Sequence, residues 1–283
     1  MASGTTVRHA PPASPVPNSL VEIGMAFSSI QQRELDEAGF LVLTDFMSSA
    51  LLDRLRERVD QLLTLEAAQA GSEFKQEPGC RRLANLIEKG TVFRELLVEP
   101  RILDLVSYVL GREFKLSSMN ARSANPHGNR RQPLHCDMNA VRDAAGYWVC
   151  NTVWMLDDFT ELNGPIRAVP GSHRSGQLPQ ETVADLFAPH PQEVLLTGSA
   201  GTVVVMNAHI WHGGIENQTA YPRRAVHGFY CRRDKPQQQY QRGLLSPEIQ
   251  ATLTSPMREL LALDDAMNDG LSADVPVRSG FLK

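Results

Sequence analysis

Cysteine is scarce in this sequence, and its spacing argues against two kinds of stabilised fold. The chain has 283 residues, and its four cysteines stand far apart without a CxxC pair, at Cys80, Cys136, Cys150 and Cys231. Neither a zinc knuckle nor a disulfide framework is indicated. Reduced thiols in the cytoplasm are the simplest interpretation, so we expect a cytoplasmic protein.

Long apolar runs and an excess of positive charge are also missing. The first residues, MASGTTVRHAPPASPVPNS, hold no apolar stretch of the signal-peptide kind, and no later run reaches the roughly 18 apolar residues that span a bilayer. The net charge of -4 offers no basic surface suited to nucleic acid. We therefore expect neither a membrane nor a nucleic-acid partner, and a flexible tail over residues 1–20.

Helical patterns come first along the chain. We expect a helix from about Ser29 to a turn at Gly39, a short strand over 40–46, and a long helix from about Ser49. Two further helices should flank Pro100. The long helix has apolar residues at three- and four-residue spacing, which predicts one buried stripe: Leu51, Leu52, Leu55, Val59, Leu62 and Leu63.

Short β-rich runs separated by Gly, Pro and Asn follow the helices. Because the helices precede the strands rather than alternate with them, we expect a mainly β fold with flanking helices, of the double-sheet jelly-roll (cupin-like) type. A single domain over 21–283 should have its core at about 114–231. Residues 232–283, with one helix over 255–267, should cap the site or form a homodimer contact. The expected strands lie at 114–124, 147–158, 164–173, 193–198, 201–207 and 223–233.

The stretch QPLHCDMN places His135 and Asp137 two residues apart on a predicted strand. Alternate side chains of a strand point to the same face, so these two could be neighbouring metal ligands, with Cys136 turned to the opposite face. A face of two histidines and one carboxylate leaves three positions open on Fe(II), which suits an oxygenase. By itself the pair is a weak signal, and such a pair more often belongs to a polar strand edge.

The segment GTVVVMNAHIWHGGIENQTAYPRRAV offers candidates for the third metal ligand and for a cation that binds the co-substrate. An apolar strand leads into a loop that carries His209 and His212, and Arg223 follows eleven residues after His212. A guanidinium group binds a carboxylate through two parallel hydrogen bonds, so Arg223 could hold the distal carboxylate of 2-oxoglutarate. His209 remains a rival for the third ligand.

Three motifs in this order, QPLHCDM, NGPIRAVPGSHRSG and WHGGIENQTAYPR, resemble the phytanoyl-CoA dioxygenase family of Fe(II)/2-oxoglutarate-dependent oxygenases. The resemblance covers roughly residues 40–230 and implies a double-stranded β-helix. It also implies that His135, Asp137 and His212 ligate iron and that Arg223 binds the C5 carboxylate of 2-oxoglutarate.

Gln132 and Asn85 resemble amide residues that contact 2-oxoglutarate in the family's secondary-metabolite branch, and Trp154 matches a family tryptophan beside the co-substrate. Their plainer interpretations are a strand-edge amide, a helix-surface amide and a core tryptophan. The NGPIRAVPGSH loop is expected to wall the pocket, with His173 in a local hydrogen-bond network rather than on the metal.

The resemblance implies that 2-oxoglutarate and O2 are consumed, that succinate and CO2 are released, and that a C–H bond of a small-molecule metabolite is oxidised. Hydroxylation is the default outcome. Desaturation, epoxidation, ring rearrangement and endoperoxide formation use the same ligands and stay open, whereas the retained Asp137 argues against halogenation. The alternative from another functional class is a non-redox, cupin-like metal-binding protein. Arg223 argues against this alternative, because the residue would have little purpose in a protein that does not bind 2-oxoglutarate.

Overall fold

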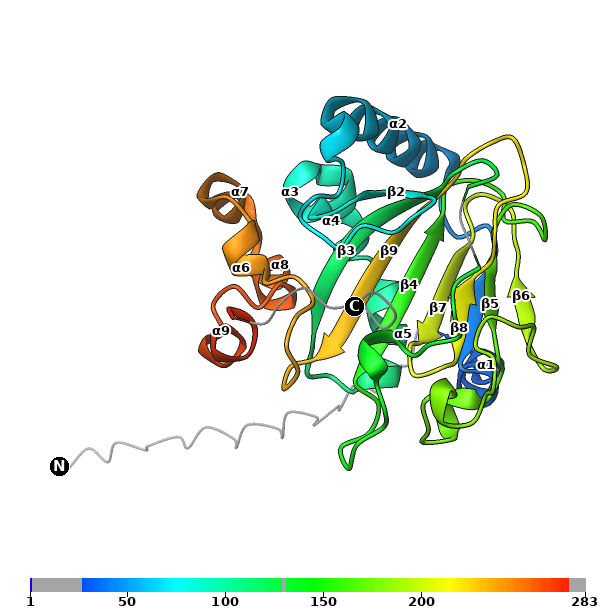
Figure 1. Cartoon of the computed structure of the whole chain (residues 1–283). Coiled ribbons are helices and arrows are strands. Elements are labelled where there is room, and N and C mark those ends of the chain that lie inside the picture. Colours follow the sequence, from blue (N-terminus) through cyan, green and yellow to red (C-terminus); the bar gives the residue numbers. More distant parts are fainter. Residues whose placement is uncertain (2–26, 129–130, 275–283) are drawn as a thin grey trace.

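The computed structural model describes Met1 and residues 27–128 and 131–274, so the predicted tail at 2–20 lies outside the described residues. Two antiparallel sheets face each other (Figure 1). The large sheet has the order β1-β7-β4-β9-β3-β2, and the small sheet has the order β6-β5-β8. This is the expected jelly-roll fold with flanking helices.

The large sheet contains the long strands of the chain. Its members are β1 (Phe40–Leu43), β7 (Val203–Asn207), β4 (Val149–Met155), β9 (Arg223–Arg232), β3 (Phe114–Ala124) and β2 (Cys80–Leu83). The small sheet contains β6 (Val194–Leu196), β5 (Ile166–Ala168) and β8 (His212–Gly214). Two of these strands, β2 and β8, were not predicted: β2 lies in a polar run, and β8 has only three residues beginning at His212.

Helices cover the outer face of the large sheet (Figure 1). They are α1 (Ser29–Ala38), α2 (Ser49–Glu66), α3 (Leu86–Lys89), α4 (Thr91–Leu97) and α5 (Pro100–Leu110). The predicted stripe of α2 packs here, although Leu51 is only half-buried. Among the described residues no helix is both long and apolar enough to span a membrane.

Alternation along the central strands divides their side chains between two cores. On β4, Cys150 and Trp154 join the outer core under the helices, whereas Val153 and Met155 join the inner core between the two sheets. On β9 the odd positions face inward in the same way. The inner face of the large sheet is therefore where a pocket can form.

The C-terminal segment folds back on the large sheet. It comprises α6 (Gln241–Leu244), α7 (Pro247–Thr252), α8 (Ser255–Leu260) and α9 (Ala266–Ser272), and its leucines enter the outer core. The single helix expected over 255–267 is wrong, because the chain turns between α8 and α9, where Ala262 has a positive φ of 52°. The proposed capping or homodimer role of 232–283 stays a prediction.

Candidate metal centre and pocket

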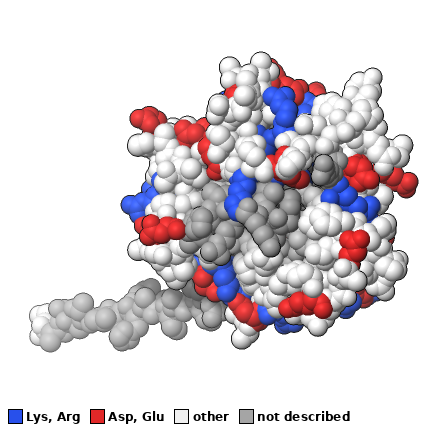
Figure 2. Space-filling model, in the orientation of Figure 1, with Lys and Arg blue, Asp and Glu red and all other residues white. Residues whose placement is uncertain are grey.

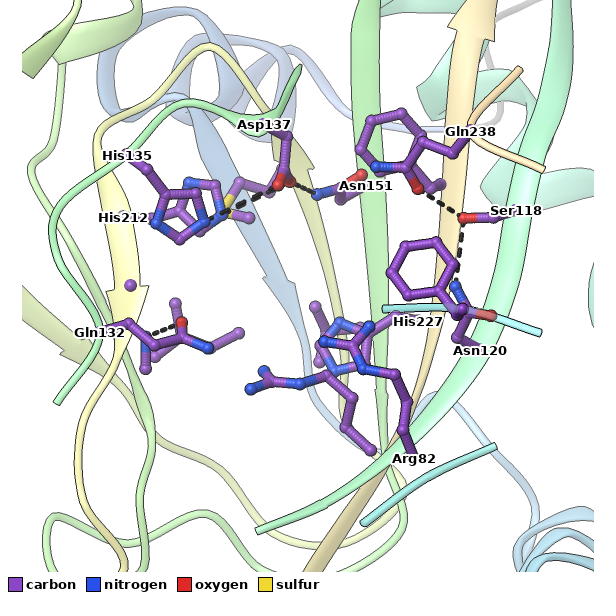
Figure 3. Close-up of a pocket in the computed structure, with 18 residues that line it drawn as sticks. Arg82, Ser118, Asn120, Gln132, His135, Asp137, Asn151, His212, His227 and Gln238 are labelled. Carbon is purple, nitrogen blue, oxygen red and sulfur yellow. Dashed lines mark hydrogen bonds and ion pairs between the residues drawn. The ribbon is translucent and has the colours of Figure 1, made fainter. Parts of the chain in front are cut away.

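The structure brings His135, Asp137 and His212 together at the inner face. One donor atom from each lies within 4.8 Å of the others. Nε2 of His135 is 3.8 Å from Oδ1 of Asp137, and Nε2 of His212 is 3.5 Å from Oδ2. The three side chains meet at one side of the pocket (Figure 3).

The backbone geometry of the pair differs from the strand that we predicted. His135 forms only an isolated antiparallel bridge with His212, with N–H···O distances of 2.9 and 3.0 Å. Asp137 then begins a tight turn in which Met138 has a φ of 53°. The two side chains converge because of this bridge and turn, while Cys136 points into a separate apolar cluster with Leu134, Val169 and Trp211.

Backbone carbonyls fix the orientation of both imidazole rings. Nδ1 of His135 lies 2.9 Å from the carbonyl oxygen of Pro133, and Nδ1 of His212 lies 2.9 Å from that of Ile210. A carbonyl oxygen only accepts, so Nδ1 carries the proton and the Nε2 lone pair is directed to the centre. Such a partner on the second nitrogen is usual for metal-binding histidines.

The local electrostatics favour the metal-binding protonation states of His135 and Asp137. Burial lowers the pKa of His135 to about 4, and the neighbouring His212 adds to this effect. Burial acts against the ionised form of Asp137, but His212, His135 and the Asn151 amide outweigh it and hold its pKa well below the ordinary value. At His212, burial acts to lower the pKa, but the Asp137 carboxylate outweighs it and raises the pKa above its ordinary value. A neutral imidazole and an ionised carboxylate are the forms that bind metal. Two histidines and one carboxylate fit Fe(II).

Asn151 was not predicted, yet its Nδ2 donates to Oδ2 of Asp137. Asn151 lies on the inward face of β4, beside the candidate metal ligands, because it alternates with the outward-facing Cys150 and Thr152. Nothing in the local sequence marks it as a site residue, because the contact depends on how β4 lies against the turn at Asp137.

Replacing Asn151 with alanine should weaken Fe(II) binding about 10- to 100-fold, since the carboxylate loses the group that orients it. Anaerobic Fe(II) titration of the variant measures this. Cys150→Ala, a change on the opposite face of β4, is the matched control and should leave the affinity unchanged. Equal affinities for Asn151→Ala and the unmodified protein would remove Asn151 from the positioning role.

The rival histidine lies elsewhere. Nδ1 of His209 is 3.0 Å from Oδ1 of Asn207, and its ring packs against Tyr147 and Trp148. His173 also lies away from the centre, with Nε2 3.2 Å from the carbonyl oxygen of Asp36. Neither belongs to the group of donors around Asp137.

The pocket beside the three candidate ligands is lined by residues from both sheets, from the loop before β2 and from the segment after β9. Gln132 lies in its wall (Figure 3), where Oε1 accepts from the Gly214 N–H at 2.6 Å and Nε2 donates to Glu77. The remaining polar lining includes Arg82, Ser118, Asn120, Arg122, Asn151, His227 and Gln238.

A buried ion-pair network occupies the basic end of the pocket. The Glu77 carboxylate accepts from Nη2 of Arg82 at 3.0 Å and from Nη2 of Arg122 at 2.6 Å. Burial raises the pKa of Glu77, but Arg122, Arg82 and the Gln132 amide outweigh this and lower it to about 2. Both guanidinium groups therefore already have a counter-ion.

Arg223 begins β9 on the same inward face as His227. Its Nη2 donates to the Gly164 carbonyl at 2.6 Å, and the guanidinium lies 4.1 Å from the centroid of the Phe159 ring. Burial and the nearby Arg122 lower its pKa to about 10, so it stays charged at neutral pH. Its Nε is buried without a hydrogen-bond partner, which fits a carboxylate that would arrive with a ligand.

Three of the four expected co-substrate contacts are not among the residues that line the pocket: Arg223, Trp154 and Asn85. Trp154 lies on the outer face of β4, where Nε1 donates to Thr152 and the ring packs edge-to-face on Phe46. Asn85 donates from Nδ2 to the Leu244 carbonyl at 3.1 Å and precedes α3 with a φ of 52°. Strand alternation and the docking of the C-terminal segment turn the side chains of Trp154 and Asn85 away from the candidate metal ligands.

Comparison with known proteins gives one family. The model of the family described as Phytanoyl-CoA dioxygenase (PhyH) matches residues 35–225. Dioxygenase af480 of Aspergillus fumigatus is 29% identical over 247 residues, covering 82% of this chain and 76% of that protein. Ectoine dioxygenase of Sphingopyxis alaskensis is 25% identical over 241 residues, covering 75% and 78%. The structure of HygX from Streptomyces hygroscopicus with nickel and 2-oxoglutarate has a TM-score of 0.63 at 19% identity, covering 75% of this chain and 90% of that one.

Proposed function

The chain belongs to the phytanoyl-CoA dioxygenase family, and from this premise we propose that it hydroxylates an unactivated C–H bond of a small-molecule metabolite. It is a 2-oxoglutarate-dependent non-haem iron dioxygenase, a class whose members need Fe(II), 2-oxoglutarate and O2. The observation that carries the proposal is the convergence of two Nε2 atoms and one carboxylate beside a pocket.

His135, Asp137 and His212 would hold the iron, each through the donor atom directed to the centre. Bound iron supplies the redox chemistry that couples decarboxylation of 2-oxoglutarate to oxidation of the substrate. Asn151 orients the Asp137 carboxylate, and the Pro133 and Ile210 carbonyls hold the two imidazole rings.

Arg223 is proposed to bind the C5 carboxylate of 2-oxoglutarate, and Gln132 is proposed to contact the same molecule. Arg223 offers an unpaired N–H in a buried setting, where a charge-assisted hydrogen bond is strong. Gln132 uses its oxygen on Gly214 and one N–H on Glu77, so its second N–H remains for a ligand.

Anaerobic addition of Fe(II) and 2-oxoglutarate tests the function directly. A visible metal-to-ligand charge-transfer band should develop, and admission of O2 should release succinate. A protein that binds Fe(II) but develops no band with 2-oxoglutarate would instead support the non-redox metal-binding alternative.

Arg223→Ala should weaken the binding of 2-oxoglutarate about 100-fold, equivalent to about 3 kcal/mol, because the distal carboxylate loses its counter-ion. Titration of the charge-transfer band measures the Kd. Arg224→Ala is the matched control, since the neighbouring Arg224 points outward and pairs with Asp157 and Asp60. Similar losses in both variants would contradict the assignment.

A further inference from the structure

The pocket has a polar wall whose residues on the β3 side are assigned to neither iron nor 2-oxoglutarate by the proposed function. Strand register places Asn151, Phe229 and Ser118 in one row across β4, β9 and β3, and places His227 and Asn120 in the next row. Because Asn151 contacts Asp137, the β3 side of these rows lies across the pocket from the two histidine ligands. Figure 3 shows Ser118 and Asn120 there.

Gln238 joins this wall from the C-terminal segment. Its backbone N–H donates to Oγ of Ser117 at 2.6 Å, and the N–H of Gln239 donates to the Ser117 carbonyl at 3.1 Å. The segment is thereby held along the part of β3 that the short strand β2 leaves uncovered. This attachment directs the Gln238 side chain into the pocket, next to Ser118 (Figure 3).

A chain of hydrogen bonds through Ser118 determines which donor and acceptor atoms of this wall remain for a ligand. The Ser118 hydroxyl donates to Oε1 of Gln238 at 2.7 Å and accepts from Nδ2 of Asn120 at 3.2 Å. Oδ1 of Asn120 is then buried without a partner, and Nε2 of Gln238 makes no hydrogen bond with the described residues. Asn120 and Gln238 thus present one acceptor and one donor, next to the buried and unpaired Nε2 of His227 and Oδ1 of Asn151. If the oxygen and nitrogen of both amides were interchanged, Asn120 would present the donor and Gln238 the acceptor, so the pair would still offer one of each.

The chemistry of that pair selects the polar group of a ligand. A carboxylate has no hydrogen to give to the acceptor of Asn120, and an ammonium group cannot accept from Gln238. A neutral amide N–H and C=O can satisfy both, which matters because an unpaired buried polar group costs about 1–3 kcal/mol. Phe74 and Phe229 also line the pocket, so the rest of the ligand can meet apolar surface.

We propose that Asn120 and Gln238 are the substrate-recognition pair and that the substrate is a neutral amide or lactam on an apolar skeleton. Its N–H donates to one side chain, and its carbonyl accepts from the other. The C-terminal segment is then part of the substrate site through Gln238. The inference rests on the proposed function, since it places this group across the pocket from the iron ligands.

The test uses the anaerobic protein loaded with Fe(II) and 2-oxoglutarate, and a panel of benzo-fused lactams, each paired with its N-methyl derivative. Binding is measured from the perturbation of the charge-transfer band, and from saturation-transfer NMR on the Zn(II)-substituted protein with 2-oxoglutarate. At least one N–H lactam should bind about 10-fold or more tightly than its N-methyl partner, since methylation leaves the acceptor unpaired.

Asn120→Leu and the nearly isosteric Gln238→Met should each abolish the preference for the N–H lactam, so that it and its N-methyl partner bind equally. The Kd of 2-oxoglutarate should stay unchanged in both variants. Gln192→Leu, a change at an exposed glutamine, should retain the preference. Equal binding within every pair, absence of binding across the panel, or a preference that survives both variants would overturn the proposal. A failed charge-transfer band would refute the proposed function instead, so the two failures are distinguishable.

Discussion

Replacing any one of His135, Asp137 or His212 with alanine should abolish succinate release. Each residue supplies one of the three donor atoms that lie within 4.8 Å of one another, so each variant leaves a site with two ligands. Loss of a residue that only orients a ligand costs about 10- to 100-fold in metal affinity or activity, and loss of the ligand itself should exceed that range. Succinate release and anaerobic Fe(II) binding should fall together.

His209→Ala is the control for this series, because His209 is also a buried histidine of the same segment. Its ring is engaged by Asn207, Tyr147 and Trp148 rather than by Asp137. A folded His209→Ala protein should retain Fe(II) binding and succinate release. If it loses both, whereas His212→Ala keeps them, the third ligand is His209.

Glu77→Ala should produce the largest loss of stability. Glu77 is 8% exposed and is the carboxylate shared by Arg82 and Arg122, which are directly opposite each other on β2 and β3. Its removal leaves two like charges adjacent and without a counter-ion, and breaking a buried pair in this way costs about 3–5 kcal/mol. Chemical denaturation measures the change in the free energy of unfolding.

Asp264→Ala provides the comparison, because it breaks a hydrogen-bonded ion pair with Arg258 in which the Asp264 side chain is 67% exposed. An exposed pair contributes about 0–1 kcal/mol. If Glu77→Ala and Asp264→Ala lower the free energy of unfolding by similar amounts, the buried Glu77 network contributes no more to stability than an exposed ion pair.

The pH dependence of stability should also reveal the contribution of the ionised Glu77. The pKa of Glu77 is lowered from 4.5 to about 2 in the folded protein, so the folded state favours the ionised carboxylate. Its contribution is fully present above pH 4.5 and is lost as the pH falls toward about 2. The unmodified protein should therefore lose more stability than Glu77→Ala over this interval.

The sequence by itself determined the features that depend on neighbouring residues. The apolar spacing of α2, the turn at Gly39 and the succession of short strands follow from local preference and periodicity, and the structure contains them. The choice of His135, Asp137, His212 and Arg223 came from the resemblance to the family, which is carried by motifs in short segments of the sequence. Even there the local geometry differed, since a bridge and a turn, rather than a strand, bring His135 and Asp137 together.

Only the tertiary structure decided which other side chains reach the pocket. Antiparallel register places Asn120 beside His227 and Asn151 beside Phe229, and the docking of the C-terminal segment adds Gln238. The same alternation turns Trp154 to the outer core. A shift of one residue in register would exchange the two faces of a strand. That register is set by packing between segments distant in sequence, which no local pattern of residues records.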